Sequence, residues 1–330
     1  MSLPNARAPL DAAAAAHAFA QLLDGAASDA DAHRFLTELA ARDETSVEIA
    51  AAAQALRNRM IAVVAPPRAI DVCGTGGDGS HSLNVSTAVA IVVAAVGVAV
   101  AKHGNRAASS QAGAADTLEA LGLDLDRASD AATDTLGSLG VAFLFAQKHH
   151  PALAKLAPVR RAIGGRTILN LIGPLANPAR VDRQLIGIAR PGFLGVFAGA
   201  VRILGTAATL LVAGDEPLDE LSIDGPSTIL WADADLPERV TPATAGLPHY
   251  PLAALRGGSA GYNAAALSRL LAGEPGAYRA AVLFNAAAAL RVAGAAADWP
   301  DGIATAAAAI DDGRAARLLA AWIAATGSGR

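Results

Sequence analysis

The amino-acid sequence predicts an α/β fold, in which a mostly parallel central sheet is flanked by helices and a smaller all-helical domain lies beside it. Two observations support this prediction. Residues 10–60 read as helices alone, whereas the chain beyond Pro66-Pro67 alternates short apolar runs with loops and helical stretches. Such alternation is typical of a parallel sheet whose connecting helices cover both faces. A chain of 330 residues is long enough for two unequal domains.

The helical domain is expected to occupy residues 1–66. Residues such as Ser28 and Thr45 can cap its helices, because their side chains accept hydrogen bonds from the free N–H groups of a first helical turn. The pair Pro66-Pro67 ends the region, since proline cannot donate to a helix and restricts the residue before it. We therefore expect a boundary there, with the α/β domain over residues 67–330.

The α/β domain is expected to contain at least five strands and several helices. The expected strands are residues 69–73, 98–101, 142–146, 185–189 and 208–213. Helices are expected from Ser86-Thr87 to about residue 96, after the third strand to residue 161, between the last two strands, and over residues 262–326. Alanine favours helix but blurs the apolar face of each one, so the sequence does not predict which faces are buried.

Composition excludes several classes of protein. The formal net charge is −4 and no basic run occurs, which argues against a non-specific nucleic-acid binder. Cys73 is the only cysteine, so an intrachain disulfide is impossible. Residues 1–10 lack the pattern of a signal peptide, and the most apolar run, residues 85–100, is short for a membrane span. We expect a soluble cytoplasmic protein.

A glycine-rich loop, residues 74–79 (Gly-Thr-Gly-Gly-Asp-Gly), follows the first expected strand. Ligands of open α/β sheets bind beyond the carboxyl ends of strands, and glycine lets the backbone approach a phosphate closely. The loop has neither the Walker nor the dinucleotide spacing, and a plain turn is the alternative. Residues 84–87 (Asn-Val-Ser-Thr) can cap the next helix, donate to phosphate oxygens, or do both, with one hydroxyl near a metal.

A second polar segment, residues 102–106 (Lys-His-Gly-Asn-Arg), follows the second expected strand, with Ser109-Ser110 beyond it. Its two cations suit a pyrophosphate group, because lysine provides a point charge and arginine a planar fork. An exposed loop without a ligand is the alternative. The location at the carboxyl end of a strand favours the binding role.

Three further features concern charged or ionisable side chains. The adjacent acids Asp219-Glu220 are usually surface residues, but beside a phosphate-binding loop they are candidate Mg²⁺ ligands, since hard cations take carboxylate oxygens. Arg160 is either a helix-surface charge or a ligand for an anion. The pair His149-His150 has no spaced carboxylate or cysteine partner for a transition-metal site.

Taken together and in order, these segments resemble the anthranilate phosphoribosyltransferase family. The glycine loop and the Lys-His-Gly-Asn-Arg block are specific in combination. The resemblance implies transfer of the ribose phosphate of phosphoribosyl pyrophosphate (PRPP) to the amine of anthranilate in tryptophan biosynthesis. It also implies a homodimer joined through the helical domains, and Mg²⁺ as cofactor. The matching segments span most of the chain and are residues 71–78, 102–106, 158–160, 166–178, 218–222 and 285–287.

The resemblance implies a nucleoside phosphorylase-like architecture, in which a mid-chain helical segment near residues 148–182 joins the N-terminal helices. It implies that Lys102 and Arg106 act in catalysis, by stabilising the charge of the departing pyrophosphate. The residues that it assigns to PRPP are Gly74, Gly77, Asp78, Ser82, Asn84, Val85, Ser86, Thr87, Lys102, His103, Gly104, Asn105, Arg106, Ala107, Ala108, Ser109, Ser110 and Ala114.

The same resemblance assigns residues to the metal and to the second substrate. The expected Mg²⁺ ligands are Ser86, Asp219 and Glu220. The expected anthranilate residues are Gly74, Asn105 and Arg160.

The sequence departs from the family pattern at three positions of one loop. The family often has serine at the position of Ala114, and lysine and serine at Gln111 and Ala112, so substrate affinity is expected to differ more than the reaction. Two other functions share this fold: a pyrimidine nucleoside phosphorylase and a non-catalytic nucleic-acid-binding relative. The acid pair Asp219-Glu220 argues against both, and the negative net charge argues against the second.

Overall fold

The computed structural model of the protein describes residues 3–107, 111–216 and 218–327. Its sheet has the strand order β3-β2-β1-β4-β5-β6-β7. The pairs from β3 to β5 are parallel, whereas β6 and β7 add antiparallel pairs at one edge, so the prediction of a mostly parallel sheet is confirmed. The strands are β1 (Ile70–Gly74), β2 (Val100–Gly104), β3 (Val141–Phe145), β4 (Arg183–Gly187), β5 (Ala208–Gly214), β6 (Ser227–Trp231) and β7 (Glu238–Val240).

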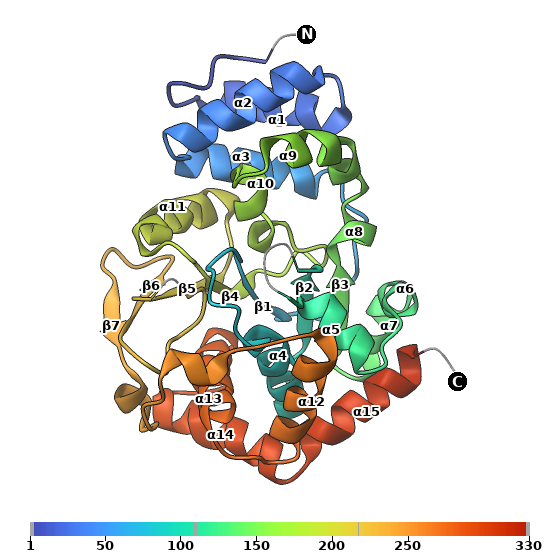
Figure 1. Ribbon diagram of the computed structural model, residues 1–330, viewed down its shortest axis with the longest axis vertical. Coiled ribbons are helices and arrows are strands. Elements are labelled where there is room, and N and C mark those ends of the chain that lie inside the picture. The colour runs from blue at the N-terminus through green and yellow to red at the C-terminus, as the bar shows by residue number, and fades with distance from the viewer. Residues whose placement is uncertain (1–2, 108–110, 217, 328–330) are drawn as a thin grey trace.

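The N-terminal helices form a separate layer above the sheet (Figure 1). They are α1 (Ala12–Asp24), α2 (Asp29–Ala41) and α3 (Ser46–Arg57). The two predicted caps are confirmed: the Ser28 hydroxyl accepts from the Asp31 N–H at 3.2 Å, and the Thr45 hydroxyl accepts from the Glu48 N–H at 3.3 Å. These caps satisfy donors that a helix start leaves free.

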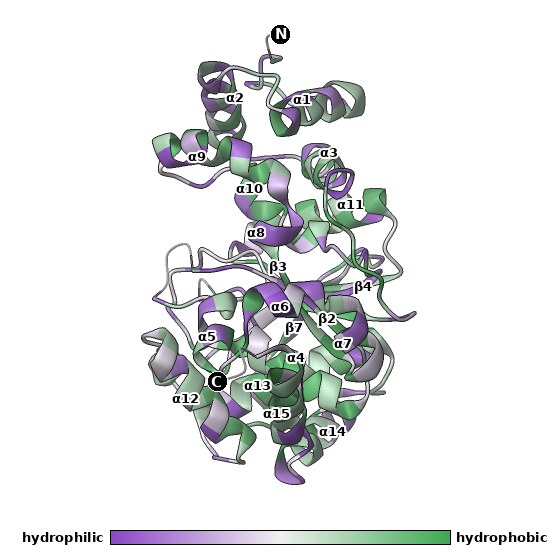
Figure 2. Cartoon of the chain, turned by 90° about the vertical axis from the view of Figure 1, so that its right-hand side faces the viewer, coloured by the Kyte–Doolittle hydropathy of each residue, from purple (hydrophilic) through white to green (hydrophobic). Residues whose placement is uncertain are grey.

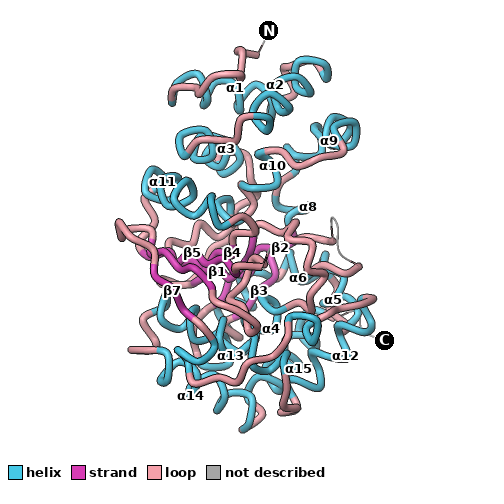
Figure 3. The backbone as a smooth tube through the Cα atoms, turned by 60° about the vertical axis from the view of Figure 1, so that its left-hand side comes forward, coloured by secondary structure: helices cyan, strands magenta, loops and turns pink. Residues whose placement is uncertain are grey.

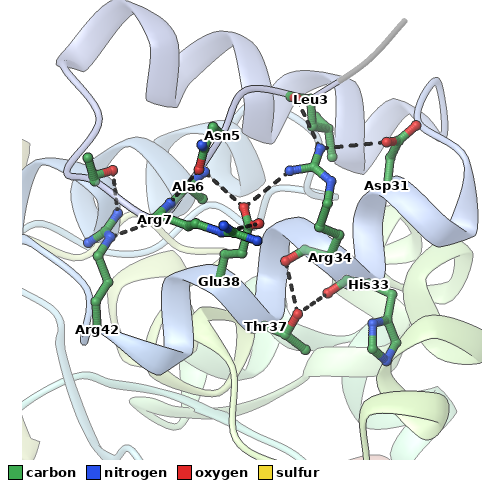
Figure 4. A network of polar contacts seen from close by, with 11 residues as sticks. Leu3, Asn5, Ala6, Arg7, Asp31, His33, Arg34, Thr37, Glu38 and Arg42 are labelled. Atoms are coloured by element: carbon green, nitrogen blue, oxygen red, sulfur yellow. Dashed lines mark hydrogen bonds and ion pairs between the residues drawn. The ribbon is translucent and has the colours of Figure 1, made fainter.

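The extended chain before α1 is fixed across α2 by a network of charged side chains (Figure 4). The Glu38 carboxylate accepts from the Ala6 N–H, Arg7 and Arg34, each at 3.1 Å. Arg34 donates in turn to the Leu3 carbonyl at 3.1 Å. The N-terminal segment is therefore anchored by polar contacts as well as by the buried Leu3 and Ala6 side chains.

Short mid-chain helices pack against the N-terminal ones. Helix α9 contacts α2, the 3-10 helix η1 contacts α1, and both α10 and the 3-10 helix η2 contact α3. One apolar core joins all of them and continues through α11 to the upper face of the sheet, with Phe19, Phe35, Leu156 and Phe197 among its members. These elements are α8 (Ala146–His149), η1 (Pro151–Leu156), α9 (Ala157–Ile163), α10 (Ile168–Leu171), η2 (Pro174–Ala176) and α11 (Leu194–Leu204).

The opposite face of the sheet is covered by α4 and the C-terminal helices (Figure 3). Helices α4 and α13 carry mostly hydrophobic residues around their whole circumference, as their colour in Figure 2 shows, because other helices surround them. Small residues let α13 and α14 approach closely: a Cβ atom at Gly302 would lie 2.8 Å from Ala287. The helices of this layer are α4 (Val85–Val96), α12 (Ala260–Leu271), α13 (Ala277–Ala293), α14 (Trp299–Asp311) and α15 (Arg314–Thr326).

The remaining described elements are short. Helices α6 and α7 pack against β3, and α5 packs against α12. No helix in the described ranges is long and apolar enough to cross a membrane. These elements are α5 (Ala114–Ala120), α6 (Leu125–Asp130), α7 (Ala132–Ser138) and the 3-10 helices η3 (Pro191–Phe193), η4 (Pro242–Ala245) and η5 (Leu252–Leu255).

The second strand differs from its predicted position. It runs from Val100 to Gly104 rather than over residues 98–101, so Lys102 and His103 lie within the strand and are buried instead of following it in a loop. The apolar stretch before it begins while the chain is still leaving α4, whose last turn ends at Gly97 with φ +106°. Apolar character alone therefore placed the strand two residues early.

Candidate active site

A cleft of about 350 Å³ lies where the carboxyl ends of β1 and β2 face the mid-chain helices. Strand β1 has β2 on one side and β4 on the other, so the chain order reverses there. Ligands of open α/β sheets bind at such a switch point. The lower wall of the cleft consists of loops that follow the strands, and the upper wall includes Leu56, Leu153, Arg160 and Leu169 from the helices.

The strands at the floor of the cleft end in glycines, and the structure gives a specific reason for two of them. Gly74 of β1 is paired with Gly187 of β4. A Cβ atom at Gly187 would lie 1.6 Å from the Asp219 carbonyl oxygen, and one at Gly74 would lie 2.1 Å from the Asp219 carboxylate. Here glycine is required because the segment carrying the acid pair crosses directly over the strand ends.

The loop after β1 brings backbone N–H groups to the acid pair. Gly76 and Gly77 have φ values of +67° and +73°, which favour glycine. The Gly76 N–H donates to the Asp219 carboxylate at 2.7 Å. Asp78 is held by the Ser80 N–H at 3.0 Å, and its charge acts on Asp219. The loop thus collects donors and a third carboxylate around the two acids that were singled out from the sequence.

Asp219 and Glu220 are unfavourably placed as free anions. Burial raises the pKa of Asp219 to about 7, and the neighbouring Asp78 charge adds to the effect. Burial and the Asp219 charge raise the pKa of Glu220 well above its usual value, although the Lys102 ammonium opposes this. A cation between the two carboxylates would relieve both effects.

The residues around this pair fit a hard cation. They provide carboxylate and hydroxyl oxygens, which Mg²⁺ prefers, and Mg²⁺ usually takes only one or two carboxylates together with substrate phosphates. The described residues contain no group of three or more His, Cys, Asp or Glu side chains arranged to hold a metal. Ser86, the third expected ligand, lies at the start of α4, and its hydroxyl accepts from Lys102 at 3.1 Å.

The two expected catalytic cations are both engaged with protein groups. The buried Lys102 ammonium donates to the Val72 carbonyl at 2.8 Å as well as to Ser86, so protein groups already bind it where it lines the cleft. Arg106 forms ion pairs with Asp116 at 2.9 Å and with Glu119, both on α5. These carboxylates raise the pKa of Arg106, with Glu119 as the main cause.

The other residues assigned to PRPP gather around the same loops. The Asn84 side chain is bonded to protein groups on two helices, and Asn105 accepts from the Arg106 N–H at 2.8 Å. Ala108, Ser109 and Ser110 lie outside the described residues. The assigned residues that line the cleft are Gly74, Gly77, Asp78, Ser82, Asn84, Val85, Ser86, Lys102, His103, Gly104, Asn105, Arg106, Ala107 and Ala114. Thr87 is buried in α4, and its side-chain oxygen has no hydrogen-bond partner among the described residues.

On the helical side of the cleft, the principal charged residue is Arg160. It lies on α9, is partly exposed to the cleft, and makes no hydrogen bond or ion pair through its side chain within the described residues. Burial lowers the pKa of its guanidinium. Among its neighbours in the cleft wall, Leu153, Leu169 and Ile172 are apolar. A guanidinium that is partly desolvated and unpaired is suited to bind a carboxylate.

Two histidines, His103 and His150, connect the two walls. The sequence predicted no role for His150. His150 of the mid-chain segment is 3.2 Å from His103 of β2, and the second ring nitrogen of His103 is 3.0 Å from the Gly173 carbonyl. Burial lowers the pKa of His103 to about 3 and that of His150 to about 4, so both are neutral at pH 7. Both side chains line the cleft.

The buried carboxylate of Asp71 also links the strands to the mid-chain segment. Asp71 of β1 accepts from the His103 N–H at 3.1 Å and from the Asn177 side chain at 2.8 Å. Asn177 also donates to the Ala101 carbonyl at 2.8 Å. No local pattern in the sequence identifies these two Asn177 contacts, because the partners are 106 and 76 residues apart along the chain.

Comparison with known proteins identifies relatives over nearly the whole chain. The model of the glycosyl transferase family, a/b domain, matches residues 66–316, and that of the glycosyl transferase family, helical bundle domain, matches residues 6–60. Anthranilate phosphoribosyltransferase from Novosphingobium aromaticivorans is 58% identical over 325 residues, which cover 98% of each chain. The enzyme of the same name from Sphingopyxis alaskensis is 59% identical over 97% of each chain.

Solved structures agree. The crystal structure of anthranilate phosphoribosyltransferase from Thermus thermophilus matches with a TM-score of 0.90 at 40% identity, over 97% of this chain and 96% of that one. The Saccharomyces cerevisiae enzyme in complex with PRPP and Mg matches with a TM-score of 0.87 at 27% identity, over 98% of this chain and 93% of that one. The similarity extends over both the helical layer and the sheet.

Proposed function

The chain belongs to the anthranilate phosphoribosyltransferase family, and we propose that its cleft transfers the phosphoribosyl group of PRPP to the amine of anthranilate. The products are N-(5-phosphoribosyl)anthranilate and pyrophosphate, in tryptophan biosynthesis. One observation supports this activity above the others: an unpaired guanidinium, Arg160, faces a glycine loop and an acid pair across a single cleft within the described part of the chain. The polar strand-end wall suits the phosphates of PRPP, whereas the helical wall, with one charge among apolar side chains, suits the aromatic acid anthranilate.

The strand-end wall is the proposed site of PRPP. Backbone N–H groups of the loop after β1, together with the start of α4, can donate to phosphate oxygens. Ser86, Asp219 and Glu220 would hold Mg²⁺, and the raised pKa values of the two carboxylates indicate that they need a counter-charge. When bound, Mg²⁺ neutralises charge on the departing pyrophosphate. A yeast relative has been solved in complex with PRPP and Mg, which supports the pairing of this substrate with this metal.

The helical wall is the proposed site of anthranilate. The guanidinium of Arg160 can bind the anthranilate carboxylate, while apolar side chains such as Leu153 and Leu169 contact the ring. Asn105 and Gly74 lie on the opposite wall and would face the amine. This arrangement directs the nitrogen toward the ribose bound below.

The reaction is a displacement at the anomeric carbon of the ribose. The bond from this carbon to the pyrophosphate oxygen breaks, the electron pair leaves with pyrophosphate, and the amine nitrogen forms the new bond and then releases a proton to solvent. Loop N–H groups are proposed to stabilise the negative charge that develops on the leaving group. Lys102 acts through the acid pair: its ammonium lies close enough to lower the pKa of Glu220.

We also propose the domain organisation and the assembly. Residues 1–66 and the mid-chain segment near 148–182 would form one helical unit, because η1, α9 and α10 pack against α1, α2 and α3. The remaining residues would form the PRPP-binding α/β unit. A homodimer joined through the helical units and a cytoplasmic location are proposed from the family.

An assay of anthranilate consumption tests the activity. Purified protein with PRPP and Mg²⁺ should consume anthranilate, measured as loss of its fluorescence, and release one pyrophosphate for each anthranilate. Omission of Mg²⁺ should abolish turnover. Phosphorolysis of a pyrimidine nucleoside without any anthranilate consumption would contradict the proposal.

A further inference from the structure

A segment from the far end of the chain supports the loop after β1. Residues 255–257 lie beside residues 81–83: the Leu83 N–H donates to the Leu255 carbonyl at 2.8 Å, and the Gly257 N–H donates to the His81 carbonyl at 2.8 Å. Ser82 and Arg256 form an antiparallel bridge between them. The approach is close, since a Cβ atom at Gly257 would lie 2.8 Å from the Ser82 carbonyl oxygen. The C-terminal half of the protein therefore supports the loop directly.

Asn263, on α12 just after this segment, is buried, and both ends of its side-chain amide are hydrogen-bonded. Its side-chain oxygen accepts from the Gly258 N–H at 2.8 Å, and its side-chain nitrogen donates to the Asn84 side-chain oxygen at 2.9 Å. Because a backbone N–H can only donate, the Gly258 contact fixes which end of the Asn263 amide faces Asn84. In the hydrogen bond between the two amides, Asn263 is therefore always the donor and Asn84 the acceptor.

The Asn263 amide in turn helps to fix the orientation of the Asn84 amide. The side-chain oxygen of Asn84 accepts from Asn263 and also from the Thr117 hydroxyl at 2.6 Å. Its side-chain nitrogen is left to donate to the Ala112 carbonyl at 3.3 Å, across in the second loop. The Asn84 carbonyl also accepts from the Tyr278 hydroxyl at 3.1 Å. Asn84 thus joins the first loop to the second, and the direction of its amide is set by Asn263 and Thr117.

We propose that Asn263 is a positioning residue for PRPP: through Asn84 it sets the spacing between the start of α4 and the backbone at Ala112, just before α5. This inference rests on the proposed function of the strand-end wall. Asn84 immediately precedes Val85 and Ser86 at the helix start, so loss of its contacts releases this start from α5 and α12. The side chain of Asn263 does not line the cleft itself, and it is connected to the start of α4 through its contact with Asn84.

The decisive variant is Asn263→Asp. It keeps an oxygen for the Gly258 N–H and nearly the same volume, but it replaces the donor to Asn84 with a second acceptor. Asn84 must then turn its amide and give up the Ala112 contact.

Thr117→Val is a second variant, which removes the other donor to the same Asn84 oxygen and preserves the test if the first does not fold. Ser259→Ala is the matched control, because Ser259 caps α12 through the Tyr262 N–H without contacting Asn84.

The measurement is the Kd of PRPP with Mg²⁺ by calorimetry, together with both KM values and kcat well below the Tm of each variant. We expect Asn263→Asp to weaken PRPP binding about tenfold, the size of one hydrogen bond to a group that must be oriented. The KM for anthranilate should stay within about twofold of the wild-type value. Ser259→Ala should lower the Tm but leave the Kd of PRPP unchanged.

The outcomes are distinguishable. A wild-type protein that does not bind PRPP overturns both the proposed function and this inference. A wild-type protein that binds PRPP, with Asn263→Asp and Thr117→Val binding it equally well, overturns the inference alone. Equal weakening in Ser259→Ala and Asn263→Asp would also overturn it, because the effect would then follow the stability of α12 rather than the orientation of Asn84.

Discussion

The two walls of the cleft are constructed in different ways. On the strand-end wall most polar groups already have protein partners: Gly76 is bonded to Asp219, Lys102 to Ser86, and Arg106 to Asp116. On the helical wall the principal charge, Arg160, has no side-chain partner among the described residues, and its apolar neighbours in the cleft lining include Leu153, Leu169 and Ile172. One wall is prearranged by many contacts, and the other presents a single charge in apolar surroundings.

This difference indicates how each substrate is recognised. A group with several charges requires many donors held at fixed spacing, and the protein holds them through glycine contacts and amide bridges. A flat aromatic acid requires one charge and an apolar surface. Substitutions on the two walls should therefore have separable effects: those on the strand-end wall should change PRPP binding or turnover, and those on the helical wall should change anthranilate binding.

The largest effect is expected from Gly187→Ala. The added Cβ atom would lie 1.6 Å from the Asp219 carbonyl oxygen, so the acid pair must move. A displacement of about 1 Å at a catalytic group can lower the rate about a hundredfold, and we expect at least that loss in kcat/KM. Steady-state kinetics at saturating Mg²⁺ is the measurement. Gly192→Ala is the control, because no described atom lies within 4 Å of a Cβ atom there; equal kinetics in the two variants would refute the steric argument.

The next effect is expected from Asp219→Asn. Loss of one carboxylate should lower kcat/KM about a hundredfold at ordinary Mg²⁺, with partial recovery in excess Mg²⁺. The same change should raise the Tm of the ligand-free protein, because burial makes the charged form of Asp219 unfavourable. Thermal melts with and without Mg²⁺ measure both effects. Unchanged activity in this variant and in Glu220→Gln would exclude a metal-binding role for the pair.

Arg160→Ala tests the helical wall. The lost charge-assisted pair with the substrate carboxylate costs about 1.5–3 kcal/mol, which corresponds to an increase of about 10- to 150-fold in the KM for anthranilate. The KM for PRPP should change little. Arg161→Ala, on the exposed neighbour, is the matched control. A parallel rise of both KM values in Arg160→Ala would indicate that the residue supports the helical layer instead.

The histidine pair between the walls should make the protein acid-sensitive. The pKa of His103 is lowered to about 3 and that of His150 to about 4, so both stay neutral in the folded state while they protonate near pH 6.5 when unfolded. Stability is therefore complete above pH 6.5 and is lost as the pH falls toward 4. At pH 5 the loss is about 2 kcal/mol for one such histidine.

Denaturant unfolding of His150→Gln at pH 7.5 and at pH 5 measures this loss. The variant should lose less stability between the two pH values than the wild type does. His33→Gln is the control, because His33 is exposed. An identical pH dependence in wild type and His150→Gln would show that the buried pair does not account for acid sensitivity.

The smallest effect is expected from Ala114→Ser. Ala114 is the first residue of α5 and lines the cleft, where the family often has a hydroxyl. The added donor should lower the KM for PRPP several-fold, less than a full charged hydrogen bond would, because water replaces part of it. Titration with PRPP at fixed Mg²⁺ decides the matter. Unchanged or weaker binding would mean that backbone N–H groups already satisfy the phosphate.

Features that depend on local sequence were predictable. The caps at Ser28 and Thr45, the parallel strands, and the glycine loop after the first strand all follow from short patterns, and the structure contains them. The edge strands β6 and β7 were not expected, because they are short and separated by Asp and Pro residues that resemble a loop.

Features that depend on distant partners were not predictable. Arg106 was expected to be available for pyrophosphate, but its pairing with Glu119 depends on where α5 starts. Asn84 was expected to act as a cap or a phosphate donor, yet its partner Asn263 lies 179 residues further along the chain. The role of Lys102 changed because the strand register buried it. In each case the contacts made in the tertiary fold decide which of its possible roles the residue takes.

The shared apolar core of the helical layer has a consequence for synthesis on the ribosome. Phe19 and Phe35 contact a core whose other members include Leu156 and Phe197. The first three helices therefore emerge long before the residues that cover their apolar faces. At about 5–20 residues per second, the interval from residue 60 to residue 200 lasts on the order of ten seconds. During that time the apolar faces of these helices, including Phe19 and Phe35, lack the later residues that cover them in the folded protein.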